Sequence, residues 1–307
     1  MAPATSITII SSPYHVGLKD HRVGTGPKRI LSLGLESQLS SLGIPTSLVE
    51  IPPVDDFEGE IGRSFEVLRR ISTAVSSAAS HGSFPLVVAG NCMSTVAIAA
   101  GLNDSLQGKE PGFVYLDAHD DFETPDTLTN GYLDATGLSM LAGQSFKALM
   151  ATLPGFVAPL KLDKFVFCGL RDLSDGMRQK VEKNGMSVVW GGDDAPSSFA
   201  AKLKQILEQK KTSLGQHPTL MHLDLDVLDQ SVGKVNGYES GGGILEKDLL
   251  ECMEVVPGKV EPVSLTVCSF NAEQGDGSDG DKVAQIGVGA IIKFVRGLLE
   301  NGHLRLK

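Results

Sequence analysis

Two short acidic segments of the chain place carboxylates and imidazoles at alternating positions. The first carries Asp117, His119 and Asp121 directly behind the apolar run 112–116. In a β-strand, alternate side chains leave the chain on the same side, so these three groups would converge where the strand opens into a loop. Carboxylates and an imidazole that converge on one point are typical of a metal site.

The second segment, 222–229, repeats this pattern with Asp224 and Asp226 behind the lead-in 218–221. Two such strand ends can hold one cation, or two cations that share a bridging carboxylate. Aspartates at strand ends can instead cap the turns that follow or bind backbone amides. Two clusters together favour the metal, because converging carboxylates without a cation repel each other and are costly to bury.

The donor types indicate which metal and which chemistry to expect. Carboxylates with one or two imidazoles suit Mn²⁺ or Mg²⁺ ahead of Zn²⁺ or Fe²⁺, and Ni²⁺ is also compatible. With two ions, a bridging water becomes hydroxide near neutral pH and can attack an electrophilic carbon. The sequence therefore predicts hydrolytic chemistry. His222 would share the strand face of Asp224, either as a partner of the ligands or as a core histidine.

Alternating strands and helices must position these clusters. The apolar run 84–89, which ends in Gly90, is typical of a strand in the middle of a parallel sheet. The whole pattern predicts a doubly wound, mostly parallel eight-stranded sheet between helical layers, where ligands bind at the carboxyl ends of strands. The expected strands cover 6–10, 45–51, 84–89, 112–116, 164–169, 187–190, 218–224 and 262–268. The expected helices cover 27–42, 57–79, 93–101, 136–150, 174–184, 198–209, 245–255 and 281–300.

The composition of the chain narrows the class of protein to which it can belong. The 307 residues are 41% hydrophobic and 21% charged, which is typical of a soluble globular chain, and no linker divides them, so one domain over 1–307 is expected. A net charge of −10 argues against nucleic-acid and anionic-membrane partners. No apolar run approaches the ~20 residues of a membrane helix, and the N-terminus lacks the build of a secretory signal. A cytoplasmic location is expected.

The four cysteines lie far apart and form no CxxC pair. This spacing argues against a zinc ribbon or a disulfide scaffold. Cys168 and Cys268 lie in apolar, strand-like runs, where a thiol packs as a small hydrophobe, and most of the four are expected to be buried thiols.

The motifs, taken in order, resemble a known family. Segments 90–94 (GNCMS), 117–121 (DAHDD), 224–229 (DLDVLD) and 241–243 (GGG) resemble the ureohydrolases, which include arginase, agmatinase, formiminoglutamase and guanidinobutyrase. The resemblance covers nearly the whole chain and identifies it as a divergent member. It implies a three-layer α/β/α fold of the arginase type, usually in trimers or hexamers.

The resemblance also implies a set of metal ligands. Two manganese ions would be held by Asp117 and Asp224 as bridges, by His119 and Asp226 at one ion, and by Asp121 and Cys92 at the other. Cys92 stands where the family usually has histidine. A thiolate is softer than imidazole and favours Zn²⁺ or Fe²⁺. The alternative is that Cys92 is simply a buried thiol beside a weak or absent metal.

Two further positions depart from the family pattern. Ser269 stands where the family has its guanidinium-binding glutamate, so the partner that would orient a guanidinium group is lost. Glu273, four residues later, either swings in from the loop as a replacement or is a solvated loop acid. Asp134 aligns near the family's proton-shuttling histidine. It could act as an acid or base, bind a substrate amine, or cap the helix that follows.

Together these features predict a metal-dependent hydrolase of C–N bonds in a guanidino or amidino compound of an atypical kind. Attack by metal-bound hydroxide would release urea or an analogue, with Asp226, Asp134 and Glu273 as the candidate catalytic residues. One alternative is a metal-deficient pseudoenzyme with a partner or regulatory role. Another is hydrolysis of a formimino or amide substrate by the same centre. The expected partners are a small-molecule substrate and further copies of the chain.

Overall fold

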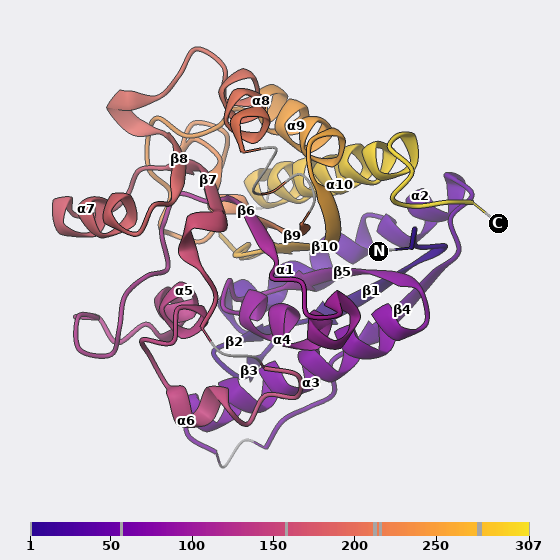
Figure 1. The fold of residues 1–307 in the computed structure, drawn as a ribbon, viewed down its shortest axis with the longest axis horizontal. Helices are drawn as coiled ribbons and strands as arrows, with labels where there is room; N and C mark the ends of the chain where they lie inside the picture. The colour runs from indigo at the N-terminus through magenta and orange to yellow at the C-terminus, as the bar shows by residue number, and fades with distance from the viewer. Residues whose placement is uncertain are drawn as a thin grey trace.

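The central element of the molecule is a parallel β-sheet. The computed structural model describes residues 2–55, 58–156, 159–210, 214, 217–274 and 278–306. Eight strands pair in the order β4-β1-β5-β10-β9-β6-β7-β8, and every pairing in this sheet is parallel (Figure 1). In that order the strands are Thr46–Glu50, Ser6–Ser12, Ser83–Ala89, Glu261–Cys268, Pro218–Asp224, Gly112–Leu116, Phe165–Leu170 and Ser187–Trp190. All eight predicted strands are present.

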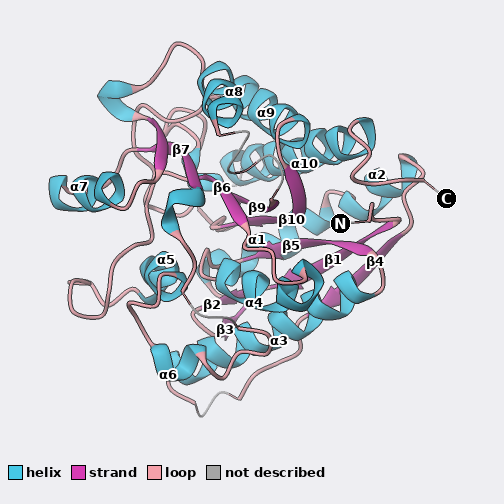
Figure 2. Ribbon diagram, viewed as in Figure 1, coloured by secondary structure: helices cyan, strands magenta, loops and turns pink. Residues whose placement is uncertain are grey.

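Helices cover both faces of this sheet (Figure 2). One face carries α3 (Glu60–Ser80), α4 (Ser94–Leu106) and α7 (Asp175–Lys183). The opposite face carries α1 (Gly26–Ser32), α2 (Leu35–Ser41), α8 (Phe199–Gln209), α9 (Glu246–Val255) and α10 (Ser278–Glu300). The predicted three-layer, doubly wound α/β/α architecture is confirmed.

Side-chain periodicity explains the two hydrophobic cores. In β5, Leu86 and Val88 pack into one core and Val87 into the other, because alternate residues of a strand face opposite sides. Helix α3 buries Phe65 and Leu68, three residues apart, on the side that faces the sheet. Residue 57, where this helix was predicted to begin, lies outside the described residues.

The predicted helix 27–42 is wrong as a single element. The structure has two helices, α1 and α2, and Gly34 between them adopts a φ of 78°. Glycine enters this left-handed region without a steric penalty, and such residues commonly end helices. An antiparallel pair near the N-terminus, β2 (Tyr14–His15) with β3 (Leu18–Lys19), has no counterpart among the predicted strands.

The predicted helix 136–150 is interrupted as well. Only α5 (Gly137–Leu141) and α6 (Lys147–Met150) form within it. Gly143 lies between them with a φ of 67°. Leu138, Met140, Leu141 and Met150 of this segment are buried although the segment is not one continuous helix.

Four neighbouring strands in the middle of the sheet place the candidate ligands. Parallel strands end at a common edge, so the segments that follow β5, β10, β9 and β6 meet there. Cys268 and Asp224 are the last residues of β10 and β9 and are paired in register. Cys92 follows β5, and Asp117 follows β6 directly. Residues far apart in the sequence are thus brought to one place.

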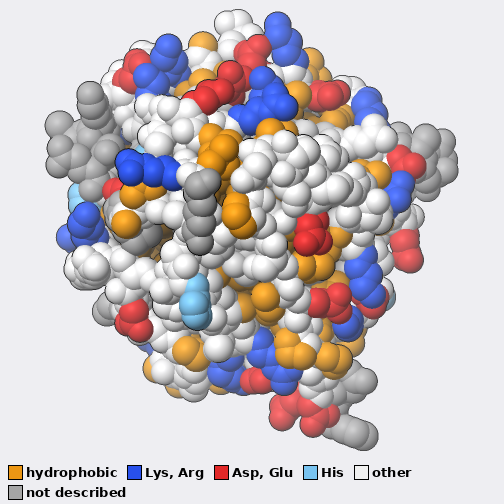
Figure 3. All heavy atoms as spheres, turned by 90° about the vertical axis from the view of Figure 1, so that its right-hand side faces the viewer, with side chains coloured by type: hydrophobic (Ala, Val, Ile, Leu, Met, Phe, Trp, Pro, Cys, Tyr) orange, Lys and Arg blue, Asp and Glu red, His pale blue; other side chains and the backbone are white. Residues whose placement is uncertain are grey.

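The surface near the chain termini mixes both kinds of charge. Figure 3 shows acidic and basic side chains interspersed over this face, with apolar side chains between them. None of the described helices combines the length and apolar character that a bilayer crossing requires.

Candidate metal centre

The first acidic segment converges through a turn and not through strand alternation. Strand β6 ends at Leu116, so the expectation that Asp117, His119 and Asp121 alternate along a strand is wrong. Asp117 Oδ1 accepts a hydrogen bond of 2.8 Å from the backbone N of His119, and Asp121 adopts a φ of 48°. Aspartate tolerates this left-handed conformation better than most residues. The turn folds the segment back on itself and gathers its side chains.

The second acidic segment uses the same device. Asp224 Oδ1 accepts a hydrogen bond of 2.7 Å from the backbone N of Asp226, within a short 3₁₀ turn, Leu225–Val227. Arg171 fixes this turn from the neighbouring loop. Its Nη2 donates to the carbonyl oxygens of Asp226 at 3.0 Å and Leu228 at 3.1 Å. Each carboxylate is therefore held by its own backbone and keeps a second oxygen for the site.

The predicted ligands meet in overlapping groups of donor atoms. Within each group the donor atoms lie within 4.8 Å of one another. The groups in the described chain are Asp117–His119–Asp226, Cys92–Asp117–Asp121 and Cys92–His222–Asp224–Cys268. Every residue predicted as a ligand belongs to at least one group, and Asp117 links the first two.

Unpaired carboxylate oxygens test whether these residues fit a cation. Asp117 Oδ2 and Asp226 Oδ1 are buried and accept no hydrogen bond from the described residues. Burial, and then the nearby carboxylate of Asp224, raises the pKa of Asp117 well above its usual range. Buried acceptors without a partner are costly, and a divalent cation would satisfy both oxygens. The residues present therefore fit a metal ion.

His119 has the environment of a metal-binding histidine. Its Nδ1 lies 3.4 Å from Asp226 Oδ2 and 3.8 Å from Asp117 Oδ1. Its Nε2 lies 3.5 Å from Asp172 Oδ2 on the opposite side of the ring. A carboxylate at the second nitrogen fixes the ring and its tautomer in metal sites. Burial opposes protonation of His119, but Asp226 and Asp172 outweigh it and raise its pKa well above the ordinary value.

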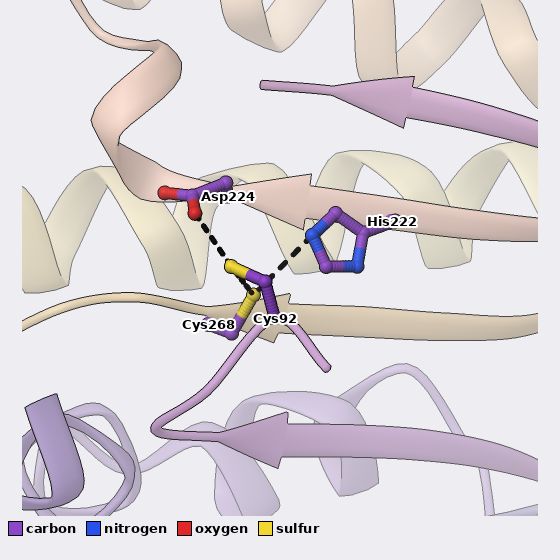
Figure 4. A group of neighbouring side chains, drawn as sticks. All are labelled: Cys92, His222, Asp224 and Cys268. Atoms are coloured by element: carbon purple, nitrogen blue, oxygen red, sulfur yellow. Dashed lines mark hydrogen bonds between the residues drawn. The ribbon is translucent and has the colours of Figure 1, made fainter. Parts of the chain in front are cut away.

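Cys92 lies among the carboxylates. Its Sγ donates to Asp224 Oδ2 at 2.7 Å and lies 3.4 Å from Cys268 Sγ (Figure 4). Burial, followed by these neighbouring groups, raises the pKa of the Cys92 thiol well above its usual range. The thiol is thus both buried and placed within reach of a bound ion.

Asp134 supports the segment that carries Cys92. Its Oδ2 accepts from Asn91 Nδ2 at 2.7 Å and from the backbone N of Cys92 at 3.1 Å, and its Oδ1 accepts from the backbone N of Met93 at 2.8 Å. Asp134 therefore caps the chain where it enters α4. The predicted cap on the following helix is absent, since α5 has no side-chain cap.

A cavity of about 330 Å³ opens over these side chains. Tyr132 and Tyr238 line it and stack with ring centroids 5.9 Å apart. Asn236 also lines it and donates to Asp226 Oδ2 at 2.8 Å and to Ser269 Oγ at 2.9 Å. Glu273 is exposed and lies outside this lining, so the structure does not bring it to the other candidates.

Some of these cavity residues had a sequence signal and others had none. Asn236 and Tyr238 belong to the loop 234–239, which contains glycine and follows the second acidic segment, a suitable place for a pocket wall. Tyr132 lies in an irregular segment and reaches the site through its stacking on Tyr238. Only the fold could reveal that contact.

Comparisons with known proteins identify the family of the chain. Residues 5–292 match the sequence family described as the Arginase family. Arginase from Bacillus subtilis is 25% identical over 261 residues, covering 82% of this chain and 85% of that protein. Arginase from Eremothecium gossypii is 24% identical over 288 residues, covering 87% of this chain and 69% of that protein.

Solved structures show the same fold. Arginase from Bacillus caldovelox superposes with a TM-score of 0.83 at 20% identity, covering 94% of this chain and 98% of that one. Proclavaminate amidino hydrolase from Streptomyces clavuligerus superposes with a TM-score of 0.69 at 17% identity, covering 96% of this chain and 93% of that one. The resemblance inferred from the ordered motifs is confirmed, and the chain belongs to the Arginase family.

Proposed function

We propose that this chain is a metal-dependent hydrolase of the ureohydrolase type that cleaves a C–N bond in a guanidino or amidino compound. Family membership supports the reaction class. The observation that carries the metal dependence is the pair of buried carboxylate oxygens, Asp117 Oδ2 and Asp226 Oδ1, which accept no hydrogen bond from the described residues.

Two ions, with Mn²⁺ as the first candidate and Zn²⁺, Fe²⁺ or Ni²⁺ as alternatives, suit this set of donors. The proposed ligands are Asp117, His119, Asp121, Asp224 and Asp226, with Cys92 beside them. When bound, divalent ions lower the pKa of water and polarise the substrate. The turns that hold Asp117 and Asp224 orient the ligands before any ion arrives.

The cavity suits a small planar cation. Asp120, Glu123 and Asp172 line it and give it acidic character. Tyr132 and Tyr238 form an aromatic wall of the cavity, and the exposed Tyr238 can offer a cation–π contact. Asn236 and Ser269 stand at its base in place of a carboxylate, which favours an atypical guanidino or amidino compound over arginine itself.

Within this proposal, Asp226 and Asp134 have different parts. Asp226 lies at the floor of the cavity, next to His119, where a proton can be exchanged with the reacting group. Both oxygens of Asp134 accept hydrogen bonds from the segment around Cys92, so its part is to hold that segment. Glu273 has no part, since it lies outside the cavity lining.

The pair of uncharged side chains Asn236 and Ser269 favours a second candidate function. Asn236 and Ser269 can bind a formimino or amide group, which carries less positive charge than a guanidinium group. A metal-deficient pseudoenzyme is the third candidate, and the Cys92 hydrogen bond to Asp224 is the feature that favours it.

A product screen with a metal assay separates these functions. The protein is loaded with Mn²⁺ and given a panel of guanidino and formimino acids, with urea, ammonia and formamide measured. The proposal expects urea or a substituted urea, and formamide or ammonia alone would indicate the second candidate. Asp117→Asn should lower bound metal at least tenfold. Asp229→Asn is the matched control, because Asp229 belongs to the same kind of motif but hydrogen-bonds to Ser231.

If the wild-type protein binds less than one ion per chain, and Asp117→Asn changes neither metal content nor stability, the pseudoenzyme hypothesis is correct and the hydrolase proposal is wrong.

The proposal also includes the assembly and location of the chain: a homo-oligomer, either a trimer or a hexamer, in the cytoplasm. Sedimentation velocity of the Mn²⁺-loaded protein should give a mass several times that of one chain.

A further inference from the structure

A group of sulfur and nitrogen donors lies behind the proposed centre. Cys92, His222, Asp224 and Cys268 each offer one ligand atom, and these atoms lie within 4.8 Å of one another. Figure 4 shows the four side chains pointing toward one another from the segment after β5 and from β9 and β10. All four residues are buried. We call this group the thiol cluster.

The spacing of the thiol cluster is close to that of a tetrahedral metal site. With Zn–S bonds of about 2.3 Å and Zn–N bonds of about 2.0 Å, a regular tetrahedron separates two sulfurs by about 3.8 Å and sulfur from nitrogen by about 3.5 Å. Cys92 Sγ and Cys268 Sγ are 3.4 Å apart, and Cys268 Sγ lies 3.5 Å from His222 Nε2. The 2.7 Å contact between Cys92 Sγ and Asp224 Oδ2 is a thiol hydrogen bond, which widens when an ion replaces the proton.

His222 is held as a metal-binding histidine would be. Its Nδ1 lies 2.7 Å from Thr95 Oγ1, and its ring stacks on Tyr115 with centroids 4.2 Å apart. A hydrogen bond at one ring nitrogen leaves the other nitrogen, here Nε2, to face the ligand position. Nε2 points to the thiol cluster, where Cys268 is its neighbour.

We propose that the thiol cluster is a mononuclear binding site for a soft or borderline divalent ion, Zn²⁺ in the first place. Two sulfurs, one imidazole nitrogen and one carboxylate oxygen form a complete four-donor set. Binding breaks the S–H bonds of Cys92 and Cys268, forms two metal–sulfur bonds, and releases two protons to solvent. No oxidation step is involved.

This inference rests on the proposed metal centre, because Cys92 and Asp224 belong to both sets of donors. The same two residues line the cavity, so an ion can enter from there and reach Cys268 and His222 behind them. An ion in the thiol cluster leaves Asp117, His119 and Asp226 for a harder ion such as Mn²⁺. The expected loaded state therefore holds two different metals.

X-ray absorption on the wild-type protein tests the inference directly. The full chain is kept reduced with a phosphine and given one equivalent of Zn²⁺ alone. The zinc edge should show two sulfur scatterers at about 2.3 Å with nitrogen and oxygen at about 2.0 Å. Co²⁺ in place of Zn²⁺ should give the thiolate-to-cobalt charge-transfer band in the near ultraviolet.

Variants separate the thiol cluster from the rest of the centre. Cys268→Ser should remove one sulfur scatterer and weaken Zn²⁺ binding at least tenfold, while Mn²⁺ binding changes less than twofold. Cys252→Ser is the matched control, because Cys252 is an equally buried thiol on α9 outside the metal-binding groups. Cys268→Val replaces the serine variant if that protein fails to fold.

Zero or one sulfur scatterer at the zinc edge of the wild-type protein overturns the thiol cluster as a site, whether or not Mn²⁺ binds. Unchanged Zn²⁺ affinity in a folded Cys268 variant also overturns the thiol cluster as a metal site. If Mn²⁺ still binds in those cases, the proposed hydrolase centre survives the loss of this inference. If neither Zn²⁺ nor Mn²⁺ binds, both fail together.

Discussion

In Asp117 and in Asp224, the two carboxylate oxygens have different roles. In each residue, Oδ1 accepts the backbone amide two positions ahead. This bond fixes the side-chain rotamer, so the other oxygen is aimed at the site without further ordering. Ligands that are oriented in advance lose little conformational entropy when an ion binds. The two acidic motifs thus encode both the ligand and its orientation.

At the same scale, the sequence could identify the donors but not all of their partners. The aspartates and His119 form local motifs, so their proximity follows from short spacings. Cys92 and Cys268 are 176 positions apart, and nothing in either segment signals the other. Their contact depends on which strands are neighbours in the sheet. Long-range pairing of this kind has no local pattern.

The hydrogen bonds of Asp134 predict a structural effect of its removal. Asp134→Asn would turn an amide NH₂ toward the backbone N–H groups of Cys92 or Met93. Buried donors left without an acceptor cost about 1–3 kcal/mol. The free energy of unfolding, measured in urea, should fall by about that amount. The pH–rate profile should keep both its acidic and its basic limb, because Asp134 does not exchange a proton with the substrate in this proposal.

Asp248→Asn provides the control for this variant. Asp248 accepts the backbone N of Phe199 at 2.7 Å at the start of α8, away from the cavity. It should lose similar stability with unchanged turnover. If Asp134 is instead a general acid or base, turnover of Asp134→Asn should drop by about 10²–10⁴-fold with stability nearly unchanged, and one limb of the profile should disappear.

At the scale of elements, the β2–β3 hairpin connects the N-terminal segment to the wall of the cavity. His15 of β2 stacks on Tyr132 with ring centroids 5.6 Å apart, and Tyr132 in turn stacks on Tyr238. Burial, with Arg22 and His21 nearby, lowers the pKa of His15 to about 4. The hairpin is therefore packed around a neutral imidazole.

This neutral imidazole predicts a pH dependence of stability. In the unfolded chain, His15 has a pKa of about 6.5, so between that value and about 4 the unfolded state binds more protons. Its contribution is complete above about pH 6.5 and is lost as the pH falls toward 4. After allowance for solvent screening the loss is about 1–2 kcal/mol. Urea unfolding of His15→Gln should show a shallower fall over this range.

The matched control is His81→Gln, because His81 is exposed at the end of α3. This variant should keep the wild-type slope. Part of the slope should persist in His15→Gln, since burial lowers the pKa of His222 to about 3 with the same sign. Identical slopes for the wild type and His15→Gln would contradict the assignment to His15.

Strands were more predictable than helices because burial leaves a clearer pattern in them. The central strand β5 is buried along its whole length and reads as a continuous apolar run. The helix over 27–42 failed at Gly34, where apolar spacing continued through a residue in the left-handed conformation. Periodicity records which side chains face the core, but not whether the backbone between them stays helical.

At the scale of the whole molecule, metal binding should stabilise the fold. The proposed ligands lie at or just after the ends of β5, β6 and β9, so a bound ion would tie these strand ends together. Free metal at about 100 times its dissociation constant adds about 2.7 kcal/mol. For 307 residues this raises the melting temperature by about 4 °C.

Calorimetry with and without a chelator measures this effect. The chelator should reverse the rise in the wild-type protein, and Asp117→Asn should show little rise under the same conditions. A rise that persists in the chelator would mean that an exchangeable ion does not cause it, and an equal rise in Asp117→Asn would place the stabilising ion elsewhere in the molecule.

The position of β10 has a consequence for how the molecule forms. This strand is the last of the sheet in sequence, yet it lies between β5 and β9 and joins the strands β4-β1-β5 to the strands β9-β6-β7-β8. The sheet therefore cannot close until synthesis has passed residue 268, and such long-range parallel pairing is slow. Before that step, the ligand segments after β5 and β9 belong to separate parts of the chain. If the chain binds metal as proposed, metal acquisition by the finished site would be a late event that follows insertion of β10.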